Sequence, residues 1–176
     1  VVRFFNSFFG AVTEKIQERG GLVNKFIGDG LLAFFMTGPN PAADAVTAAL
    51  DILDETRRLN GEGRFGEFIG DWQVSVGIGI HHGEVILGNI GSHRKMDFTI
   101  IGEHVNIASR IEGLTKEAGA VLLVSSEARA AARGGLRAQG RRAGVADAAA
   151  EDEQSAVIAL VTDLLPSGKR HVLRPD

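Results

Sequence analysis

A carboxylate at the tip of a predicted β-hairpin is the first group in this sequence that could do chemistry. Asp29 lies between Gly28 and Gly30, and the apolar segments 22–27 and 31–36 flank this tripeptide. Hard cations such as Mg²⁺ bind one or two carboxylates together with substrate phosphates, so Asp29 is a candidate metal ligand. Asp-Gly is also the usual sequence of a hairpin turn, and plain turn chemistry is the simpler alternative.

Two more charged residues lie on or beside predicted strands. Lys25 interrupts the apolar segment 22–27, where it could donate a hydrogen bond into a pocket or extend past its neighbours into solvent. Asp97 directly precedes the apolar segment 98–101, where it could also be a cap or turn residue. Taken singly, neither residue defines a site.

An amide and a guanidinium share one face of a predicted helix. Asn106 and Arg110 are four positions apart within the segment 103–117, so their side chains stack on the helix surface. Such a pair could clamp a ribose and a phosphoryl group. An ordinary solvated helix edge is the alternative.

Several other chemistries are excluded by the sequence. His81 and His82 are neighbours on a predicted strand, so they point to opposite faces and cannot chelate one ion. The chain has no cysteine, which excludes disulfides, zinc–thiolate sites and thiol nucleophiles. A net charge of −3 over 176 residues argues against a nucleic-acid partner. No apolar run approaches the ~20 residues of a membrane span, so no membrane insertion by this chain is expected.

Hydrophobic periodicity predicts the elements that must position these groups. A helix is predicted over 2–19, because its apolar residues have the spacing of one helix face; they are Phe5, Phe8, Phe9, Val12 and Ile16. The helix 103–117 is predicted to turn Ile107, Ile111 and Leu114 inward, and the paired glycines 77 and 79 indicate something packed close to their strand. The remaining expected elements are the hairpin 22–36, a helix from 41 to about 59, a loop over 60–70, and strands at 73–81, 84–90, 97–101 and 120–124. This order predicts an α+β fold with helices on one face of a mostly antiparallel sheet.

The composition changes near residue 128. Residues 129–150 are Ala, Arg and Gly with almost no large apolar side chains, and residues 155–165 are apolar again but have no evident partner. We therefore expect one domain over 1–126 and a divergent tail over 127–176. Two hypotheses stand for the tail: partial disorder, or an out-of-frame translation of a GC-rich gene.

Three segments, in this order and spacing, resemble the catalytic domain of class III adenylate/guanylate cyclases. Residues 24–35 (NKFIGDGLLAFF) resemble its metal-binding hairpin, residues 76–92 (VGIGIHHGEVILGNIGS) its central hairpin, and residues 97–112 (DFTIIGEHVNIASRIE) its last catalytic segment. The resemblance covers about residues 1–126. It implies a ferredoxin-like palm that works as a head-to-tail homodimer or cyclase-domain heterodimer, with active sites at the interface.

The resemblance also implies roles for single residues. Asp29 would be one of two aspartates that bind two divalent cations, Mg²⁺ or Mn²⁺. Lys25 and Asp97 would contact the adenine ring, and a carboxylate at Asp97 would disfavour guanine, whose carbonyl replaces the amine of adenine. Asn106 would orient the ribose, and Arg110 would stabilise charge on the α-phosphate. The implied reaction is attack of the 3′-hydroxyl of ATP on the α-phosphorus, which gives cyclic AMP and pyrophosphate.

The pattern is incomplete at its N-terminal end. In the family, a strand carrying the first metal aspartate precedes the opening helix, whereas this chain begins with residues of that helix. We expect a lone Asp29 to bind metal poorly and the missing central strand to leave backbone exposed. Two alternatives follow: a non-catalytic partner that lends a nucleotide-binding half-site to another subunit, and, with less support, a diguanylate-cyclase-like enzyme. A cytoplasmic location is expected in either case.

Overall fold

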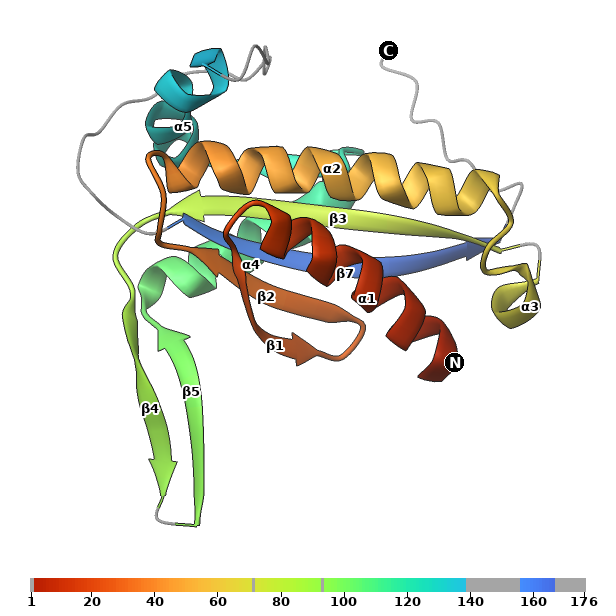
Figure 1. Ribbon diagram of the computed structural model, residues 1–176, viewed down its shortest axis with the longest axis horizontal. Helices are drawn as coiled ribbons and strands as arrows, with labels where there is room; N and C mark the ends of the chain where they lie inside the picture. The colour runs from red at the N-terminus through yellow and green to blue at the C-terminus, as the bar shows by residue number, and fades with distance from the viewer. Residues whose placement is uncertain (1, 71, 93, 139–155, 167–176) are drawn as a thin grey trace.

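The computed structural model describes residues 2–70, 72–92, 94–138 and 156–166 (Figure 1). Helices and strands are interspersed along the chain as an α+β fold. In order, the elements are α1 (Val2–Glu18), β1 (Leu22–Ile27), β2 (Gly30–Phe35), α2 (Pro41–Gly61), α3 (Gly66–Ile69), β3 (Trp72–His82), β4 (Ile86–Ser92), β5 (Lys95–Ile101), α4 (Glu103–Glu117), β6 (Leu122–Val124), α5 (Ser126–Ala138) and β7 (Ala156–Pro166).

A five-stranded sheet forms the centre of the molecule, with the strand order β1-β2-β7-β3-β6. The pairs β1–β2, β2–β7 and β7–β3 are antiparallel, and β3–β6 is parallel. Helices α1 and α2 pack on one face through a large apolar cluster that includes Phe8, Ile52 and Ile78. Helix α4 packs on the other face, where Ala108 joins Leu32 in a smaller cluster, so the prediction of helices on one face only is wrong.

The strand at the centre of the sheet comes from the C-terminal part of the chain. Residues 156–166, for which the sequence offers no partner, form β7 and pair with β2 along Gly30–Phe35 and with β3 along Trp72–His82. The expectation of exposed backbone in the centre of the sheet is therefore wrong, because β7 occupies that place (Figure 1). The proposed domain boundary after residue 126 stays a prediction, and residues 139–155 and 167–176 of the tail lie outside the described residues.

Helix α1 closely follows the apolar spacing that predicts it. The buried face of α1 is Phe4, Phe8, Val12 and Ile16, while Phe5 and Phe9 are only partly buried. The predicted face was thus displaced by one position at the start of the helix.

Helix α2 begins where its capping signals predict. The side chain of Asn40 accepts a hydrogen bond of 2.8 Å from the backbone N–H of Ala43, and Pro41 occupies the first turn.

Helix α4 has the predicted bounds but a different buried face. Its buried residues are Ala108, Glu112 and Thr115, whereas Leu114 is 48 % exposed. The glycines of β3 explain the rotation, since a Cβ at Gly79 would lie 2.3 Å from the backbone nitrogen of Glu112. Close backbone contact with β3 therefore decides the orientation of α4. Leu114 turns away from the sheet, while Ile107 and Ile111 are only partly buried.

Two short elements were missed in the sequence. The four-residue helix α3 lies inside the segment 60–70, which was expected to be a loop. Helix α5 lies at the start of the tail and packs on α2 through small residues, with the Asn40 Nδ2 donating a 2.9 Å hydrogen bond to the carbonyl oxygen of Ala131. Its buried residues Ala128, Ala132 and Leu136 recur every four positions, but two of the three are alanines, which are a weak apolar signal in the sequence.

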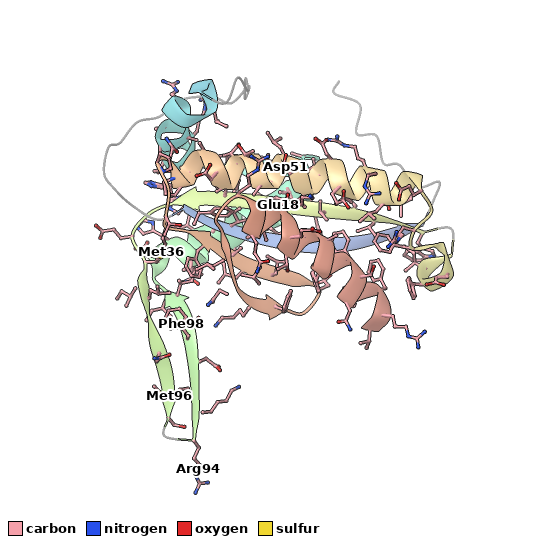
Figure 2. All side chains as sticks on the ribbon, in the orientation of Figure 1. Glu18, Met36, Asp51, Arg94, Met96 and Phe98 are labelled. Carbon is pink, nitrogen blue, oxygen red and sulfur yellow. The ribbon has the colours of Figure 1, made fainter. Side chains whose placement is uncertain are left out.

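The strands β4 and β5 form a separate two-stranded arm that projects from the body of the molecule (Figure 1). Met96 and Phe98 lie along the arm and Arg94 lies at its tip (Figure 2). Met96 and Phe98 are each 56 % exposed. An isolated two-stranded ribbon is marginally stable in water, so this arm is a surface suited to a partner.

Candidate active site

The β1–β2 turn presents Asp29 at the surface. The strands end at Ile27 and resume at Gly30, so Gly28 and Asp29 form a two-residue connection. Gly28 has φ of 61°, while no residue other than glycine has positive φ in the described chain. This combination matches a type II′ turn, which needs glycine at its first central position. Asp29 is exposed at the tip, where its carboxylate can approach a cation.

A β-bulge decides which way Lys25 faces. Val23 pairs with Ala33 and Lys25 pairs with Leu32, so Asn24 is an extra residue in β1. Without the bulge, Lys25 would lie on the same face as Val23, beneath α1. With it, Lys25 lies on the opposite face of the sheet together with Leu32, and it is exposed.

The same bulge residue joins the hairpin to the arm. The Asn24 Nδ2 donates a hydrogen bond of 3.2 Å to the carbonyl oxygen of Phe98, and the hydroxyl of Thr99 donates one of 3.0 Å to Asn24 Oδ1. These bonds flank Lys25 on one side and Asp97 on the other, so β1 and β5 bring the two predicted base-contacting residues to one seam. No sequence signal marks Asn24 as this link.

Asp97 is held loosely at that seam. Its side chain is 62 % exposed, and its carboxylate lies 3.8 Å from the ammonium group of Lys95. An exposed ion pair of this kind contributes little free energy. The carboxylate can therefore exchange Lys95 for another hydrogen-bond donor at low cost.

Asn106 and Arg110 lie on the outward face of α4. Each is two positions, or about 200°, from the buried residue Ala108, and both are exposed. Both side chains therefore point away from the sheet, whose edge strand β1 leads into the Asp29 turn.

The carboxylate of Asp29 is a suitable type of ligand for a divalent cation, but the hairpin supplies few such ligands. An exposed carboxylate supplies the hard oxygen ligands that Mg²⁺ and Mn²⁺ prefer. Within the described side chains, no group of three or more His, Cys, Asp or Glu residues gathers to hold a metal. Asp29 alone therefore needs further oxygens from other groups.

A buried histidine contact adjoins the site and was missed in the sequence. The His81 Nε2 lies 2.8 Å from His104 Nδ1, and the His81 Nδ1 lies 2.8 Å from Ser125 Oγ. Burial lowers the pKa of His81 below its ordinary value, while the carboxylate of Glu127, 3.8 Å away, acts in the opposite direction. The partners of His81 lie 23 and 44 residues further along the chain, so they leave no local pattern in the sequence.

An apolar groove lies beside the hairpin but does not coincide with these residues. It has a volume of about 740 Å³ and is lined by α1 together with Phe26 and Gly28. Phe5 and Phe9 supply much of its wall. A surface of this kind does not suit a triphosphate, so the groove is not part of the candidate site.

The arrangement of helices and strands is that of the palm fold of class III nucleotidyl cyclases. The model of the adenylate and guanylate cyclase catalytic domain matches residues 1–143, and the chain belongs to this family.

The chain is similar to curated proteins of which it spans about a quarter. It is 39 % identical over 129 residues to an adenylate cyclase of Anabaena cylindrica, a match that covers 71 % of this chain and 25 % of that protein. It is 37 % identical over 131 residues to an uncharacterised protein of Mycobacterium tuberculosis, with coverage of 72 % and 22 %.

Solved cyclase structures share the fold. A bacterial light-regulated adenylyl cyclase superposes with a TM-score of 0.63 at 30 % identity, covering 90 % of this chain and 76 % of that one. The guanylyl cyclase Cya2 gives a TM-score of 0.63 at 27 % identity, with coverage of 98 % and 83 %. Neighbours of both names occur, so similarity alone does not choose between adenine and guanine. In the described part of the chain, no helix has the length and apolar character to cross a membrane.

Proposed function

We propose that this chain is the catalytic domain of an adenylate cyclase, which converts ATP to cyclic AMP and pyrophosphate. The observation that supports the proposal is the β1–β5 seam, where Asn24 of β1 bonds to Phe98 and Thr99 of β5, so that Lys25 and Asp97 each adjoin a residue of this link in the chain. A lysine and a carboxylate at one seam suit adenine, which offers a ring nitrogen as acceptor and an exocyclic amine as donor. Guanine offers a carbonyl where adenine has the amine, and Asp97 would repel it.

This reaction depends on positioning and charge stabilisation more than on covalent participation of the protein. Asn106 holds the ribose so that its 3′-hydroxyl lies in line with the α-phosphorus, and Arg110 neutralises charge on the phosphoryl group as pyrophosphate leaves. Divalent cations, when bound at Asp29, lower the pKa of the 3′-hydroxyl and neutralise the triphosphate.

The active unit is a head-to-tail dimer of this chain. Asn106 and Arg110 face away from the body of their own chain, so a second copy must bring them to the hairpin. Exposed apolar residues on β1, on the arm and on α4 supply a surface for that contact. The largest exposed apolar side chains on these elements are Leu22, Phe26, Ile27, Ile86, Leu87, Ile90, Met96, Phe98, Ile101 and Leu114.

A direct assay tests the activity. The chain is incubated with Mn²⁺ and either ATP or GTP, and cyclic nucleotides are measured by chromatography. We expect cyclic AMP from ATP, little cyclic GMP from GTP, and loss of product in Asp29→Ala. Absence of both products would reject the enzyme and leave the alternative of a non-catalytic partner.

Mixing of two inactive variants tests the shared site. Asp29→Asn and Arg110→Ala each damage a different half-site, so a mixed dimer keeps one intact site out of two. Half of the dimers are mixed after random exchange, and the mixture should regain about a quarter of the original activity. A mixture as inactive as its components would show that both residues act within one chain.

The alternative function predicts a different result. A partner that only lends its nucleotide-binding half-site would be inactive alone with either nucleotide. It would still restore activity to a cyclase domain whose own asparagine and arginine equivalents are replaced. The same mixture made with Arg110→Ala of this chain is the control and should stay inactive.

A further inference from the structure

The two residues that the proposed function assigns to the base belong to separate sheets. Lys25 lies on β1 of the five-stranded sheet, and Asp97 lies on β5 of the two-stranded arm. The strand β1 pairs with β2, and β5 pairs with β4. The relative position of the two side chains therefore depends on contacts between the sheets and not on strand pairing.

Apolar packing brings the arm to the sheet but does not fix its register. Ile100 of β5 is buried in the cluster that contains Leu32 and Phe34 of β2. Apolar contact is non-directional, so it favours close packing of β5 without specifying how far that strand slides along the sheet. Hydrogen bonds are directional and can fix this register.

The side chain of Asn24 supplies directional bonds at this place. Its Nδ2 donates a hydrogen bond of 3.2 Å to the carbonyl oxygen of Phe98, and its Oδ1 accepts one of 3.0 Å from the hydroxyl of Thr99. Thr99 is only 5 % exposed, so the second bond is shielded from water. The donor and the acceptor of one amide thus engage two consecutive residues of β5, and a shift of that strand by one residue would break both bonds.

Asn24 also decides which face of the sheet Lys25 occupies. Because Asn24 is the bulged residue of β1, Val23 packs under α1 while Lys25 shares the face of Leu32. The arm packs on that same face. One residue therefore brings Lys25 to the side of the arm and holds the strand of Asp97 there.

We propose that Asn24 is a positioning residue that determines base selection, because it sets Lys25 and Asp97 in register across the β1–β5 seam. This inference rests on the proposed function and deepens it by naming a residue that acts through Lys25 and Asp97. If β5 slips, adenine meets one of these two groups but not both, and guanine no longer meets a well-placed repulsive carboxylate. The preference for adenine then falls.

Competitive nucleotide binding tests this role without reference to turnover. The full chain with Mn²⁺ binds a fluorescent ATP analogue, which ATP or GTP displaces, and the measured quantity is the ratio of the dissociation constant for GTP to that for ATP. Asn24→Ala keeps the extra residue of the bulge but removes both bonds, and it should lower this ratio about three- to tenfold. Partial unfolding would weaken binding of both nucleotides equally and leave the ratio unchanged.

Asn60 provides a matched control. Its Nδ2 donates a hydrogen bond of 2.7 Å to the carbonyl oxygen of Val74, and its Oδ1 accepts one of 3.0 Å from the N–H of the same residue. This amide links the end of α2 to the start of β3 instead of β1 to β5. Asn60→Ala removes two bonds of the same kind, so it should lower the unfolding temperature but keep the GTP-to-ATP ratio within about twofold of the original.

Substitutions of Thr99 separate the hydrogen bond from the bulk of the side chain. Thr99→Val removes the hydroxyl but keeps the shape, and it should lower the ratio in the same direction as Asn24→Ala. Thr99→Ser keeps the hydroxyl and should retain the original ratio. The double variant Asn24→Ala/Thr99→Val should have the same ratio as Asn24→Ala, because both changes remove the same bond.

The outcomes distinguish this inference from the proposed function. If the original chain prefers ATP and Asn24→Ala keeps that preference within about twofold, the role of Asn24 is rejected while the cyclase proposal stands. An equal fall of the ratio in Asn60→Ala would also reject it, because the effect would then follow from lost stability. If the original chain prefers ATP but forms no cyclic AMP, the enzyme is rejected and the binding ratios still decide the role of Asn24. A chain that binds both nucleotides equally, or neither, would reject the adenine preference and the role of Asn24 together.

Discussion

The His81 Nε2 lies 2.8 Å from His104 Nδ1, and this contact ties the end of β3 to the first turn of α4. His81 is 3 % exposed and is also bonded through Nδ1 to Ser125, which precedes α5. One imidazole therefore joins β3 to α4 and to the connection between β6 and α5. Since His104 is two positions before Asn106, the same contact helps to fix the turn of α4 that carries Asn106.

Replacement of His104 should destabilise the protein, because it leaves the buried His81 Nε2 without its partner. In His104→Ala the buried His81 Nε2 has lost its partner, and an unsatisfied buried polar group costs about 1–3 kcal/mol. Urea unfolding measures this loss. Ser109→Ala, at an exposed position of the same helix, is the control and should stay within about 0.5 kcal/mol of the original chain. Equal stabilities of the two variants would contradict the role given to the histidine contact.

Stability should fall as the solution becomes mildly acidic. Burial lowers the pKa of His81 below its ordinary value of 6.5, so the unfolded chain binds a proton at this residue before the folded chain does. Proton uptake by the unfolded state favours unfolding, so the contribution of His81 is complete above pH 6.5 and declines as the pH falls toward the folded-state pKa.

Unfolding in urea at about pH 7.5 and at about pH 5.5 measures this contribution. His81→Gln keeps a hydrogen-bonding side chain but cannot titrate in this range. The original chain should therefore lose more stability between the two pH values than His81→Gln loses. An identical loss in both proteins would show that other groups carry the pH dependence.

Close packing of α4 on β3 should make Gly79 intolerant of any side chain. A Cβ at this position would lie 2.3 Å from the backbone nitrogen of Glu112 and 2.7 Å from the carbonyl oxygen of Ala108, and backbone atoms cannot move independently of the helix. Gly79→Ala should thus cost about 1–3 kcal/mol, as overpacking does in other cores. Gly88→Ala, where a Cβ meets nothing within 4 Å, is the control and should be tolerated. A tolerated Gly79→Ala would mean that α4 can shift on the sheet.

The position of β7 predicts a sharp effect of truncation. A chain that ends at residue 155 lacks the strand between β2 and β3, and both neighbours lose a full set of backbone hydrogen bonds. We expect this chain to lose its cooperative thermal transition. A chain that ends at residue 166 keeps every described strand and should retain the transition. If the shorter chain unfolds like the longer one, β7 is not required for the sheet.

Elements with local signals could be predicted from the sequence. The hairpin around Asp29, the capped helix α2 and the bounds of α4 follow from turn residues, Asn40-Pro41 and apolar spacing. The buried face of α4 did not follow, because close contact with the glycines of β3 outweighs the burial of Leu114. The strand β7 did not follow either, since nothing near 156–166 in the sequence indicates where that strand pairs.

For the candidate site, the sequence predicts the residues but not the contacts that position them. The residues Asp29, Lys25, Asp97, Asn106 and Arg110 are recognisable from the three cyclase-like segments. The features that place them depend on contacts between distant segments. The bulge at Asn24 bonds to β5 across more than seventy residues, and His81 bonds to His104 of α4 and to Ser125 between β6 and α5. These roles carry no local pattern.

Base selection by Asp97 is open to a direct test. In Asp97→Asn the side chain keeps its shape and can donate a hydrogen bond to the carbonyl of guanine, which the carboxylate cannot do. Loss of one well-placed hydrogen bond to adenine, together with removal of repulsion toward guanine, should lower the ATP-to-GTP ratio of kcat/KM by roughly tenfold or more. The loose ion pair with Lys95 is exposed, so the substitution should leave the urea midpoint almost unchanged. Rates of cyclic AMP and cyclic GMP formation give the ratio, and Asp54→Asn serves as the control for loss of charge. An unchanged ratio in Asp97→Asn would mean that the base is selected by other residues.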